Sequence, residues 1–197
     1  EVNTAVCRIN DILNYESKKI KFGTIDTKDV HGIIEFRNVS LKIYDKYILQ
    51  NINLKIEHND VVAIVGEAGS GKTMMFNLLL RLFEPSKGKI TLDNVNIYDF
   101  TKETYSSTVS IVNQKPFIFN MSIRKNLNFV DNNIEHQVEA CKTAQIHDFI
   151  ETLPNGYNTI LRENGSNISG GQKQMISIAR TILTDAEVLL LDDITTS

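Results

Sequence analysis

The stretch "GEAGSGKT", residues 66–73, combines closely spaced glycines with a lysine and a hydroxyl side chain. It lies between an apolar run, "DVVAIV", and a helical pattern, "KTMMFNLLLRLF". Glycines there let backbone N–H groups point into one concavity at the positive end of the helix. The pattern predicts a nucleotide phosphate-binding loop made by Gly66, Glu67, Ala68, Gly69, Ser70, Gly71, Lys72 and Thr73. Lys72 would reach the terminal phosphates, and the Thr73 hydroxyl would ligate Mg²⁺.

Three other places carry polar groups at the ends of expected elements. The apolar run "EVLLLDD" ends in Asp192 and Asp193, a carboxylate pair that can hold a metal ion and activate a water. In "ISGGQKQ" a Gly-Gly turn opens a helix, with Ser169 at its N-cap position. Gln114, in "VSIVNQKPFIF", ends a strand where a helical region begins. The glutamine and the helix start are weak signals alone, and a phosphate loop alone does not select one reaction.

Composition sets modest bounds on the class of protein. The 197 residues suffice for one domain with a sizeable core, and the net charge of −3 gives no overall attraction to nucleic acid. Two cysteines do not make a disulfide framework, nothing resembles a secretion signal, and the apolar runs are too short to span a bilayer. We therefore expect a reduced, cytosolic environment and no nucleic-acid partner.

The patterns predict an α/β core with a helical insertion. A short amphipathic helix over residues 1–13 and a linker over residues 14–31 precede it. The expected elements are strands at 33–43, 48–56 and 60–66, a helix at 72–83, a hairpin at 89–97, helices from about 115, and a closing strand at 187–193.

In their order and spacing, these motifs resemble the nucleotide-binding domain of ATP-binding cassette (ABC) transporters. "GEAGSGKT" is similar to its Walker A loop, "NQKPFIF" to its Q-loop, "ISGGQ" to its signature and "VLLLDD" to its Walker B strand, so the resemblance covers residues 33–197. Glu163 in "TILRENGSNISGGQ" fits the exporter pattern T-x-x-x-E-x-G, and "AVCRINDIL" resembles the helical tail that follows a transmembrane domain. The implied fold is a P-loop NTPase (RecA-like) core with an antiparallel β edge and an inserted helical subdomain at about 115–180.

The resemblance also implies a mechanism. Two such domains pair head to tail and enclose two ATP molecules, each between one phosphate loop and the partner's signature. The signature residues toward ATP are Ser169, Gly170, Gly171 and Gln172. Gln114 would sense the γ-phosphate or Mg²⁺, Asp192 would hold Mg²⁺ through water, and Asp193 occupies the position of the catalytic base. The implied partners are a second nucleotide-binding domain and a transmembrane domain, at the cytoplasmic face of a membrane.

Three departures from the family pattern matter. Asp193 stands where the family usually has glutamate, which shortens the reach by ~1.5 Å, and misplacement of that size can cost on the order of 100-fold in rate. The adenine-stacking tyrosine aligns with Ile43; we assign the role to Tyr44, although Tyr44 and Tyr47 could both instead pack on the core. The D-loop aspartate and switch histidine do not occur before Ser197, so we expect a chain that lacks the C-terminal part of the domain.

Three functions stay open. The first is the ATPase domain of an exporter, although hydrolysis by this chain alone is in doubt. The second is a regulatory module that closes on ATP and hydrolyses it slowly or not at all, which Asp193 favours. The third is a soluble cassette ATPase, which would explain neither the N-terminal tail nor Glu163.

Overall fold

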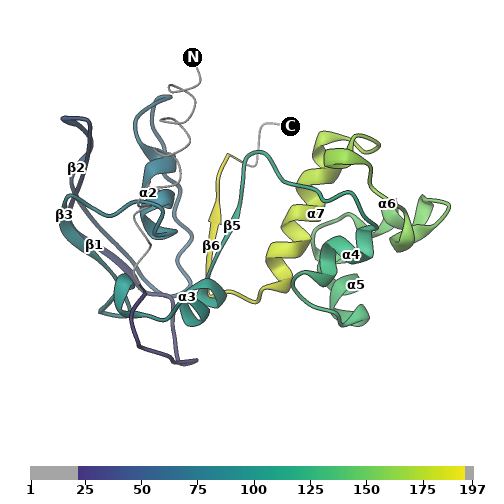
Figure 1. Cartoon of the computed structure of the whole chain (residues 1–197), viewed down its shortest axis with the longest axis horizontal. Coiled ribbons are helices and arrows are strands. Elements are labelled where there is room, and N and C mark those ends of the chain that lie inside the picture. The colour runs from purple at the N-terminus through teal and green to yellow at the C-terminus, as the bar shows by residue number, and fades with distance from the viewer. Residues whose placement is uncertain (1–21, 194–197) are drawn as a thin grey trace, which may run out of the picture.

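The computed structural model describes residues 22–193, so the helix expected over residues 1–13 lies outside the described residues. Figure 1 shows three parts side by side: an antiparallel sheet with the helix α2, a pair of parallel strands, and a group of helices. Within the described range, no helix combines the length and apolar character needed to cross a membrane.

The antiparallel sheet has the strand order β2-β1-β3-β4. Its strands are β1 (Ile34–Ile43), β2 (Lys46–Ile56), β3 (Lys87–Leu92) and β4 (Val95–Asn96). The turn between β1 and β2 holds Tyr44 and Asp45, and the turn between β3 and β4 holds Asp93 and Asn94; all four have positive φ. Two consecutive positive φ values match the right-handed twist of the flanking strands, so the expected hairpin at 89–97 is confirmed.

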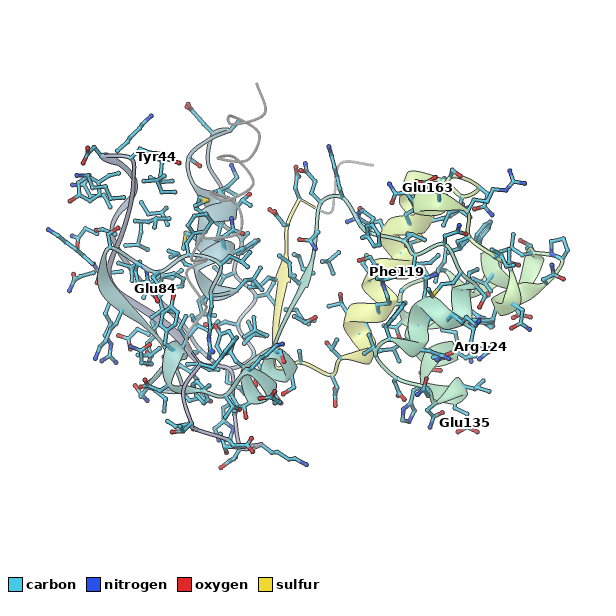
Figure 2. All side chains as sticks on the ribbon, in the orientation of Figure 1. Tyr44, Glu84, Phe119, Arg124, Glu135 and Glu163 are labelled. Carbon is cyan, nitrogen blue, oxygen red and sulfur yellow. The ribbon has the colours of Figure 1, made fainter. Side chains whose placement is uncertain are left out.

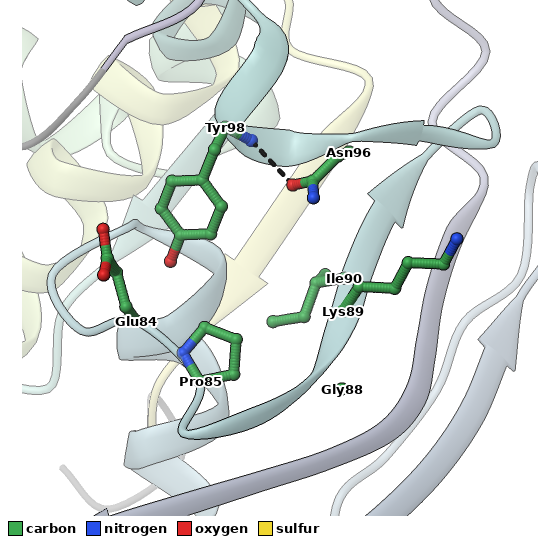
Figure 3. A pocket seen from close by; sticks show the side chains of 7 residues that line it. All are labelled: Glu84, Pro85, Gly88, Lys89, Ile90, Asn96 and Tyr98. Atoms are coloured by element: carbon green, nitrogen blue, oxygen red, sulfur yellow. Dashed lines mark hydrogen bonds between the residues drawn. The ribbon is translucent and has the colours of Figure 1, made fainter.

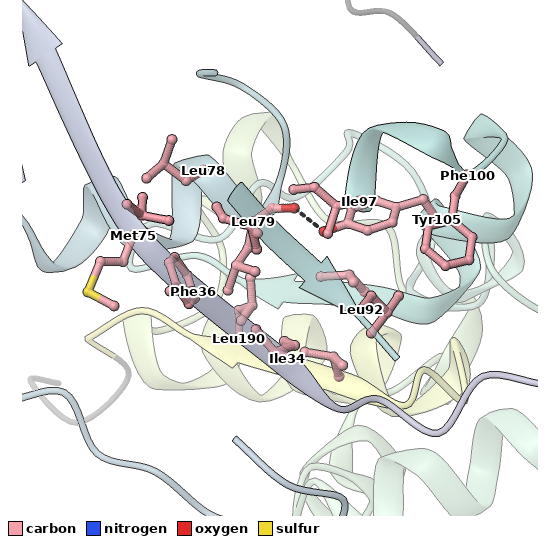
Figure 4. Packing of buried hydrophobic residues seen from close by; sticks show 14 of the residues in the cluster. Ile34, Phe36, Met75, Leu78, Leu79, Leu92, Ile97, Phe100, Tyr105 and Leu190 are labelled. Atoms are coloured by element: carbon pink, nitrogen blue, oxygen red, sulfur yellow. Dashed lines mark hydrogen bonds between the residues drawn. The ribbon is translucent and has the colours of Figure 1, made fainter. Parts of the chain in front are cut away.

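The parallel pair consists of β5 (Val109–Val112) and β6 (Val188–Leu191). Its apolar side chains join the core under the antiparallel sheet, where Val109, Val188 and Leu190 are buried. The core also contains α2 (Lys72–Leu79) and the segment of η1 (Ile97–Asp99) and α3 (Lys102–Thr108), as Figure 4 shows. One hydrophobic cluster therefore connects the helix after the phosphate loop with both sheets.

The helical part has a hydrophobic cluster of its own, which includes Ile123, Leu127, Ile150, Leu161 and Ile176. Its elements are α4 (Ile123–Asn128), α5 (Ile134–Thr143), α6 (His147–Thr152), η2 (Gly156–Asn158), η3 (Glu163–Gly165) and α7 (Gly170–Leu183). This separate core explains how the helices stand beside the sheets as an insertion between β5 and β6.

The structure corrects one predicted strand. Residues 60–66 form no strand in the described part of the chain, and Val61, Val62 and Val65 are exposed. A strand needs neighbours to pair its backbone groups and cover its side chains. No described residue pairs with this segment, because the parallel sheet consists of β5 and β6 alone. The apolar sequence "VVAIV" is therefore insufficient to make a strand here.

The helix after the phosphate loop is also shorter than the pattern predicts. It ends at Leu79, and the chain turns at Arg81, whose φ is 58°. The Arg81 side chain is buried and donates hydrogen bonds to backbone carbonyls of the η1 segment, which holds the chain in this turn.

Candidate nucleotide-binding site

The phosphate loop is an exposed turn that leads directly into α2. Gly69 and Gly71 have φ values of 81° and 96°, in the left-handed region that favours glycine. A Cβ at Gly71 would lie 2.8 Å from Leu49 Cδ2, whereas a Cβ at Gly69 would meet nothing within 4 Å. Gly71 is thus required by close packing against β2, and the surface at Gly69 is open to a ligand.

The Lys72 ammonium lies over this loop. Its Nζ donates to the carbonyl oxygens of Gly66 at 2.8 Å and of Glu67 at 2.9 Å. Among residues 22–193, no carboxylate forms an ion pair with Lys72. A lysine charge balanced only by neutral carbonyls, at the positive end of a helix, suits a polyanionic ligand such as a triphosphate. The loop therefore fits the predicted phosphate group.

Thr73 and Asp192 face each other across the site. The Thr73 hydroxyl lies 3.4 Å from Asp192 Oδ1, although 119 residues separate them in the chain. Hydroxyl and carboxylate oxygens are the ligands that Mg²⁺ prefers. This pair fits the predicted magnesium site.

Gln114 and Asp193 also meet. Gln114 Nε2 donates to Asp193 Oδ2 at 2.8 Å. Each residue follows the carboxyl end of a parallel strand, and the strands are neighbours, so both side chains reach the same edge of the sheet. The structure thus brings Lys72, Thr73, Gln114 and the aspartate pair to one edge.

The signature residues lie apart from this edge, at the start of α7. Ser169 is the N-cap: its Oγ accepts a hydrogen bond from the Gln172 N–H at 3.2 Å, and the Gln172 side chain accepts one from the Ser169 N–H at 2.8 Å. This capping box confirms the predicted helix start. Nothing lies within 4 Å of a Cβ built at Gly170 or Gly171. Figure 1 places the starts of α2 and α7 on opposite sides of the β5–β6 pair.

The two candidate tyrosines differ in exposure. Tyr44 lies at the tip of the β1–β2 hairpin, where Figure 2 labels it. The residue is 99% exposed. Tyr47 is 42% exposed, and Lys42 Nζ lies 5.9 Å from its ring centroid. Ile43 packs against the core. Tyr44 is thus free to stack on a ligand, but it makes no contact with the phosphate loop.

Two arginines were not predicted as part of this region. Arg180 on α7 donates from Nη2 to the Phe117 carbonyl at 2.6 Å, which connects the signature helix to the segment that follows Gln114. Burial lowers the pKa of Arg180. An arginine within the apolar pattern "MISIARTIL" was the available signal. Arg81 gave the same kind of signal, an arginine within the apolar run "LLLRLF", but the sequence does not reveal its partners, the carbonyls of Ile97 and Phe100.

A hollow of about 190 Å³ lies beside β3 and contains none of the predicted site residues (Figure 3). Its lining is Glu84, Pro85, Gly88, Lys89, Ile90, Asn96 and Tyr98. Asn96 accepts a hydrogen bond there from the Tyr98 N–H at 3.1 Å. The candidate nucleotide site is therefore the open edge at the phosphate loop.

Comparison with known proteins identifies the class of protein. Residues 49–196 match the family model "ABC transporter". The chain is 37% identical over 201 residues to ABC transporter B family member 2 of Dictyostelium discoideum (98% of this chain, 14% of that protein). It is 41% identical over 181 residues to multidrug resistance protein pgp-1 of Caenorhabditis elegans (91% of this chain, 13% of that protein).

A solved structure is similar as well: that of a bacterial Atm1-family ABC exporter with ATP bound. It has a TM-score of 0.84 and 29% identity, and the match covers 99% of this chain and 36% of that chain. The chain therefore belongs to the ABC transporter family. The predicted family and fold class are confirmed. The chain spans between 13% and 36% of the length of these relatives.

Proposed function

We propose that this domain binds and hydrolyses Mg-ATP in a head-to-tail pair, and that hydrolysis drives export across a membrane. The observation that carries the proposal is the division of the site. Lys72, Thr73, Gln114 and the aspartates gather at one edge, whereas the signature residues start a helix beyond the parallel strands. One chain thus presents two half-sites, each of which a second domain would complete.

The roles follow from the chemistry of each group. The loop N–H groups and Lys72 would bind the phosphates, and Thr73 and Asp192 would hold Mg²⁺, which neutralises charge on phosphate oxygens when bound. Asp193 would accept a proton from the attacking water, and Gln114 would orient that water. In the partner's site, Ser169 and the amides at the start of α7 would face the γ-phosphate. Tyr44 would stack on adenine.

The partners follow from the same division. The second domain is another nucleotide-binding domain, identical or related. The other partner is a transmembrane domain. It would be connected to the nucleotide-binding domain by the proposed helical tail over residues 1–13 and the linker over residues 14–31. In this arrangement the domain would lie at the cytoplasmic face of a membrane.

A regulatory module that binds ATP without turning it over is the second candidate, and Asp193 favours it. Aspartate retains the carboxylate charge but is one C–C bond, ~1.5 Å, shorter than the usual glutamate. In that case the pair would close on ATP, and hydrolysis would occur at a related partner's site.

Binding of a fluorescent ATP analogue with Mg²⁺, followed by phosphate release, tests both candidates. We expect Lys72→Ala to weaken binding at least about 10-fold, since a charge-assisted contact is lost. Lys102→Ala is the matched control, because Lys102 is likewise the first residue of a helix and its side chain is exposed away from the site. A wild-type chain that binds no nucleotide would refute the proposal. Binding without release at any protein concentration would favour the regulatory module.

A further inference from the structure

One backbone carbonyl, that of Phe100, accepts hydrogen bonds from two distant parts of the chain. The Gly23 N–H donates to it at 3.0 Å, and Arg81 Nη1 donates to it at 3.3 Å. Gly23 belongs to residues 22–27, here named the strap, and Arg81 follows the helix of the phosphate loop. We propose that this junction couples docking of the strap to nucleotide binding, with Arg81 as the positioning residue.

Arg81 fixes the far end of α2. The residue is 3% exposed, and its Nη2 also donates to the Ile97 carbonyl. The guanidinium carbon lies 3.7 Å from the Tyr105 ring centroid. The Tyr105 hydroxyl donates to the Leu79 carbonyl at 2.6 Å, a contact visible in Figure 4. Two buried side chains therefore clamp the end of α2 to the η1–α3 segment.

The charge of Arg81 makes the clamp sensitive to geometry. Among the described residues, Arg81 forms no ion pair with a carboxylate, and its partners are carbonyls and aromatic rings. A buried guanidinium loses hydration, so it depends on those carbonyls remaining in place. A lysine would keep the charge but would lack the planar fork that reaches two carbonyls.

The strap binds the same segment through its backbone. The Ile25 N–H donates to the Asp99 carbonyl and its carbonyl accepts from the Thr101 N–H, both at 2.9 Å. The Phe22 ring centroid lies 5.6 Å from the Arg81 guanidinium carbon. These contacts place the strap on the clamp of α2, although residues 14–31 read as a linker in the sequence.

Gly23 is the position at which the strap can be displaced selectively. A Cβ there would lie 1.9 Å from the Asp99 carbonyl oxygen, which is backbone and cannot move aside alone. Gly23→Ala should therefore lift the strap without changing any side chain of the clamp. Thr24→Ala is the matched control, because Thr24 is exposed and its side chain makes no hydrogen bond within residues 22–193.

The path from strap to nucleotide is short and rigid. The helix α2 has eight residues, with Lys72 at its start and Arg81 just beyond its end. A shift of the Phe100 carbonyl would therefore move Arg81, the helix and the loop together. Thermodynamic linkage makes this coupling reciprocal. If docking of the strap raises the affinity for ATP by some factor, bound ATP must raise the equilibrium constant for strap docking by the same factor. This inference rests on the proposed function, since it assumes that the loop binds ATP.

The experiment measures affinity for a fluorescent ATP analogue with Mg²⁺ and hydrogen exchange at the Gly23 and Ile25 amides. We expect Gly23→Ala and Arg81→Lys each to weaken binding about five-fold or more. The double variant should be no weaker than the worse single one, because both break one junction. Saturating Mg-ATP should slow amide exchange in the strap of the wild-type chain and not in Arg81→Lys.

Phe22→Ala provides a milder variant, since Phe22 is 44% exposed and its loss should not prevent folding. It should weaken nucleotide binding in the same direction as Gly23→Ala. Normal affinity in the folded variants, or strap exchange that Mg-ATP does not change, would overturn the inference alone. A wild-type chain that binds no nucleotide would overturn the proposed function and the inference with it.

Discussion

Replacing Asp193 by glutamate should raise the rate of ATP hydrolysis. Asp193 follows β6, and the preceding backbone is fixed: the Asp192 N–H donates to the Val112 carbonyl at 3.0 Å. The Asp193 carboxylate accepts a hydrogen bond from Gln114 at 2.8 Å. The strand end is therefore held in place, and the length of the side chain sets how far the carboxylate reaches.

The expected size of the effect follows from that length. A glutamate adds one C–C bond, ~1.5 Å of reach. Since misplacement of a reacting group by about 1 Å can cost on the order of 100-fold, Asp193→Glu should raise kcat by about 10- to 100-fold. KM should change little, because the contacts to the phosphates are made by Lys72 and the loop.

The assay is phosphate release at saturating Mg-ATP over a range of protein concentrations, with Lys72→Ala as the blank. A rate that rises faster than linearly with protein concentration would show that a pair of chains is the active species. Asp185→Glu is the control, because Asp185 is exposed and has the same φ as Asp193, 49°. It reports the cost of placing glutamate in the left-handed region, about 1–2 kcal/mol at most.

The reasoning would be refuted by an unchanged or lower rate in an Asp193→Glu chain that still binds ATP like the wild type. An equal rise in Asp185→Glu would also refute it. If neither Asp193 nor Glu at this position supports release, the regulatory module becomes the better description of the domain.

Three further predictions concern stability. Ser169→Ala removes the capping box of α7 and should lower the free energy of unfolding by about 1 kcal/mol in urea titrations. Asn126→Ala should cost about 1–3 kcal/mol, because the fully buried Asn126 side chain bonds both the N–H and the carbonyl of Phe119; an effect below that of Ser169→Ala would contradict this. Burial raises the pKa of Tyr98 from 10 to about 12, and the neutral phenol donates a hydrogen bond to the Phe83 carbonyl. The neutral phenol therefore stabilises the fold below pH 10, and this contribution is lost between pH 10 and about 12. The melting temperature of Tyr98→Phe should fall less steeply with pH over that range than that of the wild type.

Features set by local chemistry were predictable from the sequence. The Ser169 cap, the glycine turns of the phosphate loop and the Asp93-Asn94 hairpin each depend on a few adjacent residues. The family resemblance then implied that Gln114 and the aspartates serve one ATP site, and the structure supplies the physical reason, because the neighbouring parallel strands β5 and β6 end together. The candidate site residues could therefore be predicted from a few short sequence motifs.

Features that depend on distant neighbours were not predictable. The run "VVAIV" has the composition of a buried strand, but whether it pairs depends on which strands lie beside it. The strap looked like a linker because its bonds to the η1–α3 segment join residues more than 70 positions apart. Arg81 has no periodic partner, and its role rests on backbone carbonyls that any sequence could supply.

The groups that would bind ATP already have partners within the chain, so binding must exchange contacts. Lys72 would leave the carbonyls of its own loop for phosphate oxygens, and the net affinity would be smaller than the sum of the new contacts. The same exchange would release Gln114 from Asp193. Because Arg180 holds the Phe117 carbonyl, the chain that follows Gln114 is attached to α7. A displacement of Gln114 would thus be transmitted to α7, whose first residues would contact the ATP bound to the partner domain. ATP binding at the phosphate loop of one chain would therefore shift the signature residues of the same chain, which belong to the second ATP site.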